Sequence, residues 1–243
     1  MKLKNKVCLI TGSSRGIGKA IALGFAKEGG HVIVTYRSDR KAAVKTAAEI
    51  GLKDIYKLDV SKKTSVQNIF TKVKKKYGKI DVLVNNAGVN KANDFDKLSE
   101  KDWDYVMDTN LKGVFFCCQE VLKHMPNKGK IINIGSLSGE YGGPRTPSYA
   151  AAKAGVMSLT HCLARFTGKK NINVNCISPG IIAGEFTQAS MAKSVRKIID
   201  NLLLIKRPGK NEDIVGAAIF LATKESEYIT GQTISINGGA WVR

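Results

Sequence analysis

The chain has 243 residues, 39 of them Lys or Arg and 20 Asp or Glu, which gives a formal net charge of +19, and 43% of the residues are hydrophobic. That composition is globular and excludes fibrous and low-complexity chains; no apolar run approaches the roughly 20 residues of a membrane span, and Val7–Ile10 is far shorter than a signal-peptide core. Of the basic residues 31 are Lys and 8 are Arg, which indicates a solvated Lys surface rather than a nucleic-acid-binding surface, because the latter uses the bidentate geometry of Arg.

Short runs rich in Val and Ile alternate with longer segments of helical periodicity, a pattern typical of βα units that build a parallel sheet. In chain order, the predicted strands are Lys6–Thr11, His31–Tyr36, Ile55–Leu58, Val82–Asn85, Lys130–Ile134, Asn173–Ile177 and Thr233–Ile236. The predicted helices are Gly16–Lys27, Arg40–Ile50, Ser61–Tyr77, Asp102–His124, Tyr149–Arg165 and Glu212–Ala222. Seven such strands predict an α/β fold with one doubly wound parallel sheet and helices on both faces.

No linker and no shift in composition divides the chain, so we expect residues 1–243 to form a single domain. The least regular stretch is Gly180–Pro208, which is longer than a usual βα connection. Long loops of this kind often cover binding sites. We therefore expect the substrate lid at about residues 180–208.

Five cysteines, an odd number, lie on apolar segments: Cys8, Cys117, Cys118, Cys162 and Cys176. Their spacing does not pair them as metal ligands. We expect reduced, buried thiols in a cytoplasmic protein, with neither a disulfide nor a metal site.

The first predicted strand runs straight into the glycine-rich segment Thr11–Gly18, which opens a helix. Glycines permit a tight turn there and let backbone N–H groups approach a phosphate at the helix N-terminus. A glycine turn can also be a structural loop, but its place between the first strand and the first helix favours dinucleotide binding. The candidate cofactor-binding residues of this turn are Gly12, Ser14, Arg15, Gly16, Ile17 and Gly18.

Two further motifs accompany this turn: Asn-Asn-Ala-Gly at Asn85–Gly88 after the fourth strand, and Tyr149-x-x-x-Lys153. In this order, and with a match that extends over the whole chain, the three motifs resemble the short-chain dehydrogenase/reductase family. The resemblance implies a single Rossmann-type domain of seven strands, a nicotinamide cofactor and a homotetramer.

The resemblance also implies cofactor contacts beyond the glycine turn. Asn86, Ala87 and Gly88 would contact the adenosine side, as would Asp59 and Val60 after the third strand. A helix-capping Asp is the alternative for Asp59. Cofactor contacts are likewise implied for Tyr149, Lys153, Pro179 and Ile182, the last two beside the nicotinamide carboxamide.

The choice between NADP and NAD depends on the end of the second strand, where an acidic side chain would accept from the ribose 2′-hydroxyl and an Arg would meet a 2′-phosphate. Arg37 comes first after that strand, and Arg15 lies in the glycine turn. Two guanidinium groups suit a phosphate dianion, so we expect NADP. The rival is Asp39, 21 positions beyond Gly18, which would serve NAD if the strand ended later.

Reduction of a ketone needs an acid that protonates the forming alkoxide. Tyr149 and Lys153 are four residues apart at the start of a predicted helix and so share one face, where the ammonium favours the ionised phenol. Ser136 follows the strand Lys130–Ile134 and would hold the substrate oxygen at the carboxyl edge of the sheet. The family spacing to Tyr149 selects Ser136 over the nearby Ser138.

Asn110 matches the fourth catalytic residue of the family, which holds a water that links the lysine to solvent as a proton relay. A polar residue that merely distorts a helix is a compatible alternative. One departure concerns the cofactor: many relatives have a Thr two residues after the position of Ile182, and this chain has Gly184.

Among the branches of the family, the segments Tyr149–Gly155 and Ile229–Gly239 look most like the 3-oxoacyl-(acyl-carrier-protein) reductases of fatty acid synthesis. A polyol, sugar or other small-ketone dehydrogenase is the alternative. A dinucleotide-sensing protein without catalysis is less expected, because a pure binder needs no proton donor beside the nicotinamide.

The charge is unevenly distributed, since residues 121–180 contain eight basic residues and one acidic residue, Glu140. In the resembling reductases an acidic carrier protein docks on basic residues near the mouth of the active site. The comparable residues of this chain are Lys128, Lys130, Lys169 and Lys170. A Lys-rich solvated surface would show the same residues, so both interpretations stay open.

Overall fold

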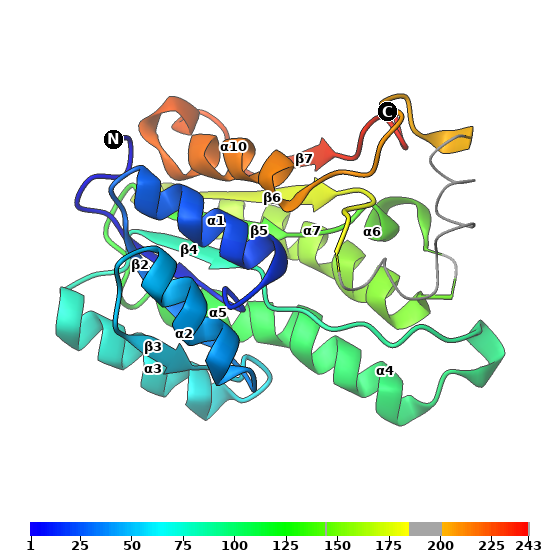
Figure 1. Cartoon of the computed structure of the whole chain (residues 1–243), viewed down its shortest axis with the longest axis horizontal. Coiled ribbons are helices and arrows are strands. Elements are labelled where there is room, and N and C mark those ends of the chain that lie inside the picture. Colours follow the sequence, from blue (N-terminus) through cyan, green and yellow to red (C-terminus); the bar gives the residue numbers. More distant parts are fainter. Residues whose placement is uncertain (144, 185–200, 243) are drawn as a thin grey trace.

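The computed structural model describes residues 1–143, 145–184 and 201–242, and its strands form one sheet (Figure 1). The strands are β1 (Val7–Ile10), β2 (His31–Tyr36), β3 (Ile55–Lys57), β4 (Val82–Asn85), β5 (Lys130–Ile134), β6 (Asn173–Pro179) and β7 (Thr233–Ile236). Their order is β3-β2-β1-β4-β5-β6-β7, and each neighbouring pair is parallel. The predicted doubly wound seven-stranded sheet is confirmed, with its switch point between β1 and β4.

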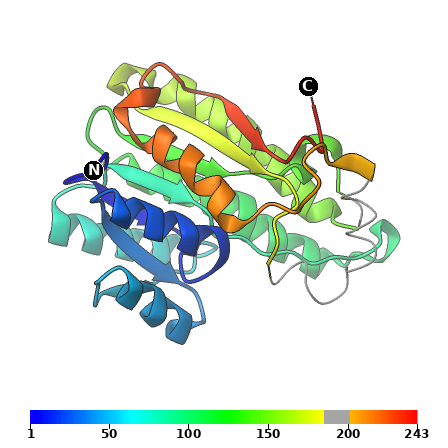
Figure 2. The same cartoon turned by 45° about the horizontal axis from the view of Figure 1, so that its top comes forward.

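Helices cover both faces of the sheet (Figure 2). Helices α1 (Gly16–Lys27), α2 (Arg40–Glu49) and α10 (Asn211–Ala222) pack on one face; α3 (Lys63–Tyr77), α5 (Gly113–Val121) and α7 (Pro147–Thr167) pack on the other. Along β1, Cys8 and Ile10 join the α1 side, whereas Val7 and Leu9 join the α7 side. Burial on both faces explains why the central strands β1 and β4 are nearly continuous apolar runs.

The predicted helix Asp102–His124 is wrong as a single element. The structure contains α4 (Glu100–Met107), a π-helical turn η2 (Asp108–Lys112) and α5 in succession. Ser99 caps α4, because its side chain accepts a hydrogen bond from the N–H of Asp102 at 3.2 Å. The turn η2 contains Asn110, and such one-turn π segments often mark functional sites.

Other predicted ends shift by a few residues. Helix α7 begins at Pro147, two residues before the predicted start, because the first turn of a helix has no use for the N–H that proline lacks. Strand β6 continues to Pro179, because Ser178 and Pro179 still pair with Ser235 and Ile236 of β7. Strand β6 therefore extends to Pro179, the first residue of the segment Pro179–Ile182 that is predicted to contact the nicotinamide.

The predicted lid, residues 180–208, lies partly outside the described residues, which omit 185–200. Its described ends are joined to each other: the N–H of Ala183 donates to the carbonyl of Gly209 at 2.8 Å, and the N–H of Gly209 donates to the carbonyl of Ile181 at 2.8 Å. Both described ends of this segment therefore lie beside the carboxyl end of β6.

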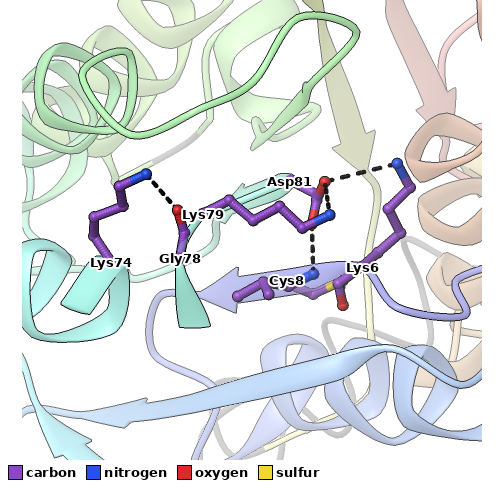
Figure 3. A network of polar contacts seen from close by, with 7 residues as sticks. Lys6, Cys8, Lys74, Gly78, Lys79 and Asp81 are labelled. Carbon is purple, nitrogen blue, oxygen red and sulfur yellow. Dashed lines mark hydrogen bonds and ion pairs between the residues drawn. The ribbon is translucent and has the colours of Figure 1, made fainter. Parts of the chain in front are cut away.

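The opposite edge of the sheet is held by a buried carboxylate (Figure 3). Asp81, directly before β4, accepts a hydrogen bond from the N–H of Val7 at 2.8 Å. The same carboxylate forms ion pairs with Lys79 at 3.0 Å and Lys6 at 3.7 Å. These contacts join the starts of β1 and β4 at the amino edge.

The basic cluster on α3 forms a solvated face, as predicted, because Lys72, Lys74, Lys75 and Lys76 are exposed while Val66, Ile69, Phe70 and Val73 are buried. All five cysteines are free, and four of them are buried. The expectation of a buried thiol is wrong for Cys162, which lies on the outer side of α7 and is exposed. Among the described helices none is long and apolar enough to span a membrane.

Candidate functional site at the carboxyl edge of the sheet

The glycine turn after β1 is built around a close approach to the segment after β4. Gly12 has φ +65°, and a Cβ there would lie 3.0 Å from the Cα of Ala87. A Cβ at Gly18 would lie 2.4 Å from Nδ2 of Asn86. Glycine is therefore required at both positions, by backbone conformation at Gly12 and by space at both.

Buried hydroxyl groups support this turn from below. Oγ1 of Thr35, in β2, accepts from the N–H of Gly12 at 3.0 Å and donates to the carbonyl of Ile10 at 2.9 Å. Oγ of Ser13 accepts from the N–H of Thr35 at 2.9 Å. Sequence reasoning missed this support; the signal was a Thr in the Val-rich strand His31–Tyr36.

The side chain of Asn86 joins the two segments directly. Its Nδ2 donates to the carbonyls of Thr11 at 2.9 Å and Gly12 at 3.0 Å, and its backbone N–H donates to Oγ1 of Thr11 at 2.9 Å. In this structure the predicted cofactor ligand Asn86 thus holds the glycine turn with its amide. The adjoining Ala87 and Gly88 lie at the same edge.

A nicotinamide dinucleotide fits this cradle. Helix α1 starts in the turn at Gly16 and has no acidic residue in its first turn, so the partial positive charge at its N-terminus is available to a phosphate. Ser14, Arg15 and Ile17 lie in the same turn.

The two candidate selectors of the cofactor differ in what they contact. Arg37 is exposed, donates to the hydroxyl of Tyr105 at 2.8 Å, and its guanidinium carbon lies 5.5 Å from the centroid of that ring. Asp39 instead caps α2, with its carboxylate accepting from the N–H of Ala42 at 2.9 Å. Tyr105, from α4, is a neighbour that the sequence did not indicate.

The remaining predicted cofactor residues lie at the ends of β3 and β6. The carboxylate of Asp59 accepts from the N–H and the hydroxyl of Ser61, at 3.0 and 2.7 Å. These bonds close a turn before α3, whose N-cap is Lys62, so Asp59 does not cap that helix. Val60 is buried. The carbonyl of Pro179 accepts from the N–H of Leu137 at 2.9 Å, and Ile182 forms a bridge to Gly209.

Three of the predicted catalytic residues meet where β5 ends and α7 begins. Nζ of Lys153 lies 5.7 Å from the centroid of the Tyr149 ring and donates to the carbonyl of Ile134 at 2.5 Å. Lys153 is buried, Tyr149 is half-buried, and Ser136 is two residues beyond that carbonyl. Oγ of Ser136 accepts from the N–H of Ser138 at 3.2 Å.

Asn110 joins this group through the segment after β4. Its Oδ1 accepts from the N–H of Val89 at 2.8 Å, and its Nδ2 donates to the carbonyl of Val89 at 2.8 Å. The π turn and these two bonds show that the side chain has the structural role considered as the alternative. The predicted relay function is compatible with this role, because the amide oxygen of Asn110 and the carbonyl oxygen of Val89 each have a second lone pair that can accept a hydrogen bond from a water.

Below this group lies a thiol that the sequence did not connect with the site. Burial raises the pKa of Cys176, in β6, to about 11, and the Lys153 ammonium opposes that rise. A Cβ at Gly135 would lie 2.7 Å from Sγ of Cys176. The thiol is thus a neutral packing group beneath the loop that carries Ser136.

The basic residues predicted near the site mouth lie at the other edge of the sheet. Lys130 begins β5, whereas Ser136 follows its end. Nζ of Lys130 donates to Oδ1 of Asn173 at 2.7 Å, and burial lowers its pKa. Lys128, Lys169 and Lys170 are exposed. Lys169 and Lys170 follow the C-terminal end of α7, a helix of 21 residues and about 30 Å, whereas Tyr149 lies in its first turn. Within one chain these lysines therefore do not lie near the mouth of the site, and the predicted position is wrong.

The glycine cradle and the Ser-Tyr-Lys group define an oxidoreductase of the short-chain dehydrogenase/reductase family, and the chain belongs to that family. Residues 12–240 match the family model described as enoyl-(acyl carrier protein) reductase. Membership implies a nicotinamide dinucleotide cofactor.

Particular relatives carry a narrower name. The 3-oxoacyl-[acyl-carrier-protein] reductase FabG of Staphylococcus epidermidis is 41% identical, over 98% of this chain and 100% of its own length. The FabG of Thermotoga maritima is also 41% identical, over 98% and 99%. Among solved structures, a variant of a short-chain dehydrogenase/reductase from Serratia marcescens superimposes with a TM-score of 0.93 at 33% identity, covering 99% of both chains. A structure from Agrobacterium tumefaciens with a provisional assignment as a gluconate dehydrogenase has a TM-score of 0.92 at 31% identity, covering 100% of this chain and 98% of that one.

Proposed function

We propose that this protein is an NADPH-dependent 3-oxoacyl-(acyl-carrier-protein) reductase of fatty acid synthesis. The observation that carries the proposal is the 41% identity, over nearly full length, to reductases of that name from two distant bacteria. The grouping of Ser136, Tyr149 and Lys153 at one edge supports chemistry rather than cofactor sensing, because a sensor needs no proton donor there.

The cofactor, when bound in the glycine cradle, supplies the hydride that reduces the ketone carbon. Tyr149 then protonates the oxygen as negative charge develops on it, and Ser136 holds that oxygen by a hydrogen bond. Lys153, whose ammonium is buried beside the tyrosine ring, stabilises the phenolate that remains. Asn110 supports proton return to the tyrosine through a water chain.

We assign the preference for NADP over NAD to Arg37, which follows β2, and to Arg15. Arg37 is exposed at the end of the strand, and Arg15 lies in the glycine turn, so the chain offers two guanidinium groups for a 2′-phosphate. Asp39 is engaged as the cap of α2, which makes it a poorer partner for a 2′-hydroxyl. NAD remains the alternative, with Asp39 as its acceptor.

A homotetramer in the cytoplasm completes the proposal. An apolar groove lies on the outer side of α5, η2 and α7, lined by Met107, Leu111, Phe115, Gly155, Leu159 and Cys162. Phe115 is 44% exposed there. A second copy would cover such a surface, and size-exclusion chromatography with light scattering measures the assembly.

The test is a substrate panel run with NADPH and with NADH. We expect acetoacetyl thioesters of carrier protein and of coenzyme A to be reduced faster, by kcat/KM, than sugars or simple ketones, and NADPH to be preferred. If the thioesters are reduced no faster than sugars, the acyl substrate is wrong. A preference for NADH that persists in Arg37→Ala would remove the cofactor assignment.

The second candidate is a dehydrogenase of sugars, sugar acids or other small alcohols. It is favoured by the Agrobacterium structure with its provisional gluconate dehydrogenase assignment, which superimposes with a TM-score of 0.92. The two candidates separate in the same panel, because a gluconate dehydrogenase would oxidise gluconate with the oxidised cofactor and ignore the thioesters.

A further inference from the structure

Glu140 lies close to the candidate active site and has no role assigned so far. It is the one acidic residue between positions 121 and 180. It belongs to the short helix α6 (Ser138–Tyr141), which starts two residues after Ser136. Its Oε1 accepts two hydrogen bonds, from the hydroxyl of Ser178 at 2.5 Å and from the hydroxyl of Ser235 at 3.2 Å.

The two serines reach one oxygen because of the sheet register. Ser178 of β6 and Ser235 of β7 are directly paired residues of parallel strands, so their side chains point to the same face. That face is apolar near the amino edge, where Val174 joins the core against α7. Toward the carboxyl edge it becomes polar, with Ser178 in place of an apolar residue.

One of the two residues bound by Glu140, Ser178, leads directly into the candidate site. Ser178 is completely buried and precedes Pro179, the first residue of the predicted nicotinamide segment. The N–H of Leu137 donates to the carbonyl of Pro179 at 2.9 Å, so the backbone already joins the Ser136 loop to this segment. Through its bond to Ser178, Glu140 adds a side-chain link between the same two segments.

A charged acceptor makes this link stronger than a neutral one. Hydrogen bonds to a carboxylate are shorter and roughly twice as strong as neutral bonds, and the 2.5 Å separation from Ser178 is of that kind. The charge also acts within the site: the thiol of Cys176 has its pKa lowered by Lys153 and raised by Glu140. The carboxylate and the Lys153 ammonium therefore act in opposite directions on the same buried thiol.

We propose that Glu140 is a positioning residue that fixes the Pro179–Ile182 segment against the Ser136 loop, so that cofactor and substrate oxygen are held in one geometry. The inference rests on the proposed reductase function for its effect on turnover. The expected effect on cofactor binding does not depend on the proposed reductase function. Substitution should affect both, because reacting groups must be aligned closely for hydride transfer.

The test compares Glu140→Ala, Glu140→Gln, Ser178→Ala and the double variant Glu140→Ala/Ser178→Ala with wild type. Thr71→Ala, which alters an exposed threonine on the solvated face of α3, is the matched control. The dissociation constant for NADPH is measured by fluorescence titration without substrate, kcat with the best substrate of the panel, and Tm for every variant. All kinetics are run well below the lowest Tm.

We expect Glu140→Ala to lower kcat about tenfold and to raise the NADPH dissociation constant about fivefold. Glu140→Gln keeps an acceptor oxygen and should stay within about threefold of wild type. Ser178→Ala should cost about threefold alone and nothing further in the double variant, since the two residues form one link. Thr71→Ala should match wild type.

The proposal is overturned if Glu140→Ala lowers Tm but leaves kcat and the NADPH dissociation constant within twofold, because the residue would then be purely structural. It is also overturned if the two substitutions act additively. Should Glu140→Ala fail to fold, Ser178→Ala decides: a change of about threefold supports the link, and values of kcat and of the NADPH dissociation constant within twofold of wild type overturn it. If the thioesters are not substrates, the NADPH titration still decides, so this failure and that of the proposed function are distinguishable.

Discussion

Tyr149 and Lys153 occupy successive turns of α7, with the ammonium 5.7 Å from the ring centroid. Removal of the hydroxyl in Tyr149→Phe leaves that packing in place and removes the proton donor. We expect kcat to fall by about 10²- to 10⁴-fold, the usual contribution of a general acid. The NADPH dissociation constant, measured by titration, should change by less than about twofold, whereas retained turnover would show that another group protonates the substrate.

Gly184 is the residue at which this chain departs from many relatives. A Cβ built there meets no described atom within 4 Å, so a larger side chain has space. We expect Gly184→Thr to tighten NADPH binding by about three- to tenfold, because a hydroxyl there adds a hydrogen bond to phosphate. Gly184→Val, of nearly the same shape, is the control, and equal affinity of the two variants would show that the hydroxyl makes no such bond.

Arg37 is held by Tyr105, which accepts its hydrogen bond at 2.8 Å and lies under its guanidinium. Arg37→Ala should reduce the ratio of kcat/KM for NADPH over NADH by about 10- to 100-fold, since a charge-assisted bidentate contact would be lost. Tyr105→Phe removes the hydroxyl alone, and we expect it to reduce the same ratio by about threefold. An unchanged ratio in Arg37→Ala would place the selector elsewhere.

At the scale of elements, β4, β5 and α7 are joined through the core by amide side chains. Nδ2 of Asn85 donates to Oδ1 of Asn133 at 2.8 Å, and Nδ2 of Asn133 donates to Oγ1 of Thr160 at 2.9 Å. All three residues are buried. This chain of bonds fixes the distance between the strand that leads to Ser136 and the helix that carries Tyr149.

Thr160→Val tests that connection, since it keeps the shape and leaves an N–H of Asn133 without its acceptor. We expect a loss of about 1–3 kcal/mol in the free energy of unfolding, the cost of an unsatisfied buried donor. Urea denaturation measures it. Thr160→Ser keeps the hydroxyl and should cost less; if the two variants are equally destabilised, the methyl group rather than the hydrogen bond is responsible.

The sequence predicts the elements that are determined by residues close together in the chain. Runs rich in Val and Ile marked the seven strands, most clearly the central ones that are buried on both faces, and the glycine turn marked the cradle through Gly12 and Gly18. The π turn at Asn110 was missed, since it depends on Val89, 21 residues away. Glu140 and Tyr105 were missed for the same reason: their partners come from other elements, and periodicity carries no such information.

At the scale of the whole molecule, the site and the basic cluster occupy opposite edges of the sheet. Sequence distance suggested the reverse, because residues 121–180 are contiguous in the chain but β5 and α7 each run from one edge to the other. If Lys128, Lys169 and Lys170 bind an acidic carrier, we expect them to serve the site of a neighbouring copy. The carrier and tetramer proposals are thus linked.

A triple reversal of those three lysines to Glu tests this link. We expect kcat/KM for acetoacetyl-carrier protein to fall about tenfold and its dependence on ionic strength to weaken. The neutral acetoacetyl-N-acetylcysteamine thioester should be reduced as by wild type. Equal losses for both substrates would show damage to the catalyst, and no loss for either would remove this face as a docking surface.

The position of β7 at the end of the sheet has a consequence for amide hydrogen exchange. Strand β6 is buried along its whole length, whereas β7 is half-buried with Ser235 exposed. Local opening of a fold starts where the fewest buried contacts hold an element, so amides of β7 should exchange before those of β6. Each such opening separates Ser235 from Glu140 and uncovers the outer side of the strand that ends at Pro179. Exchange rates along β7 would therefore report how often this edge of the candidate site opens, without any substrate or turnover.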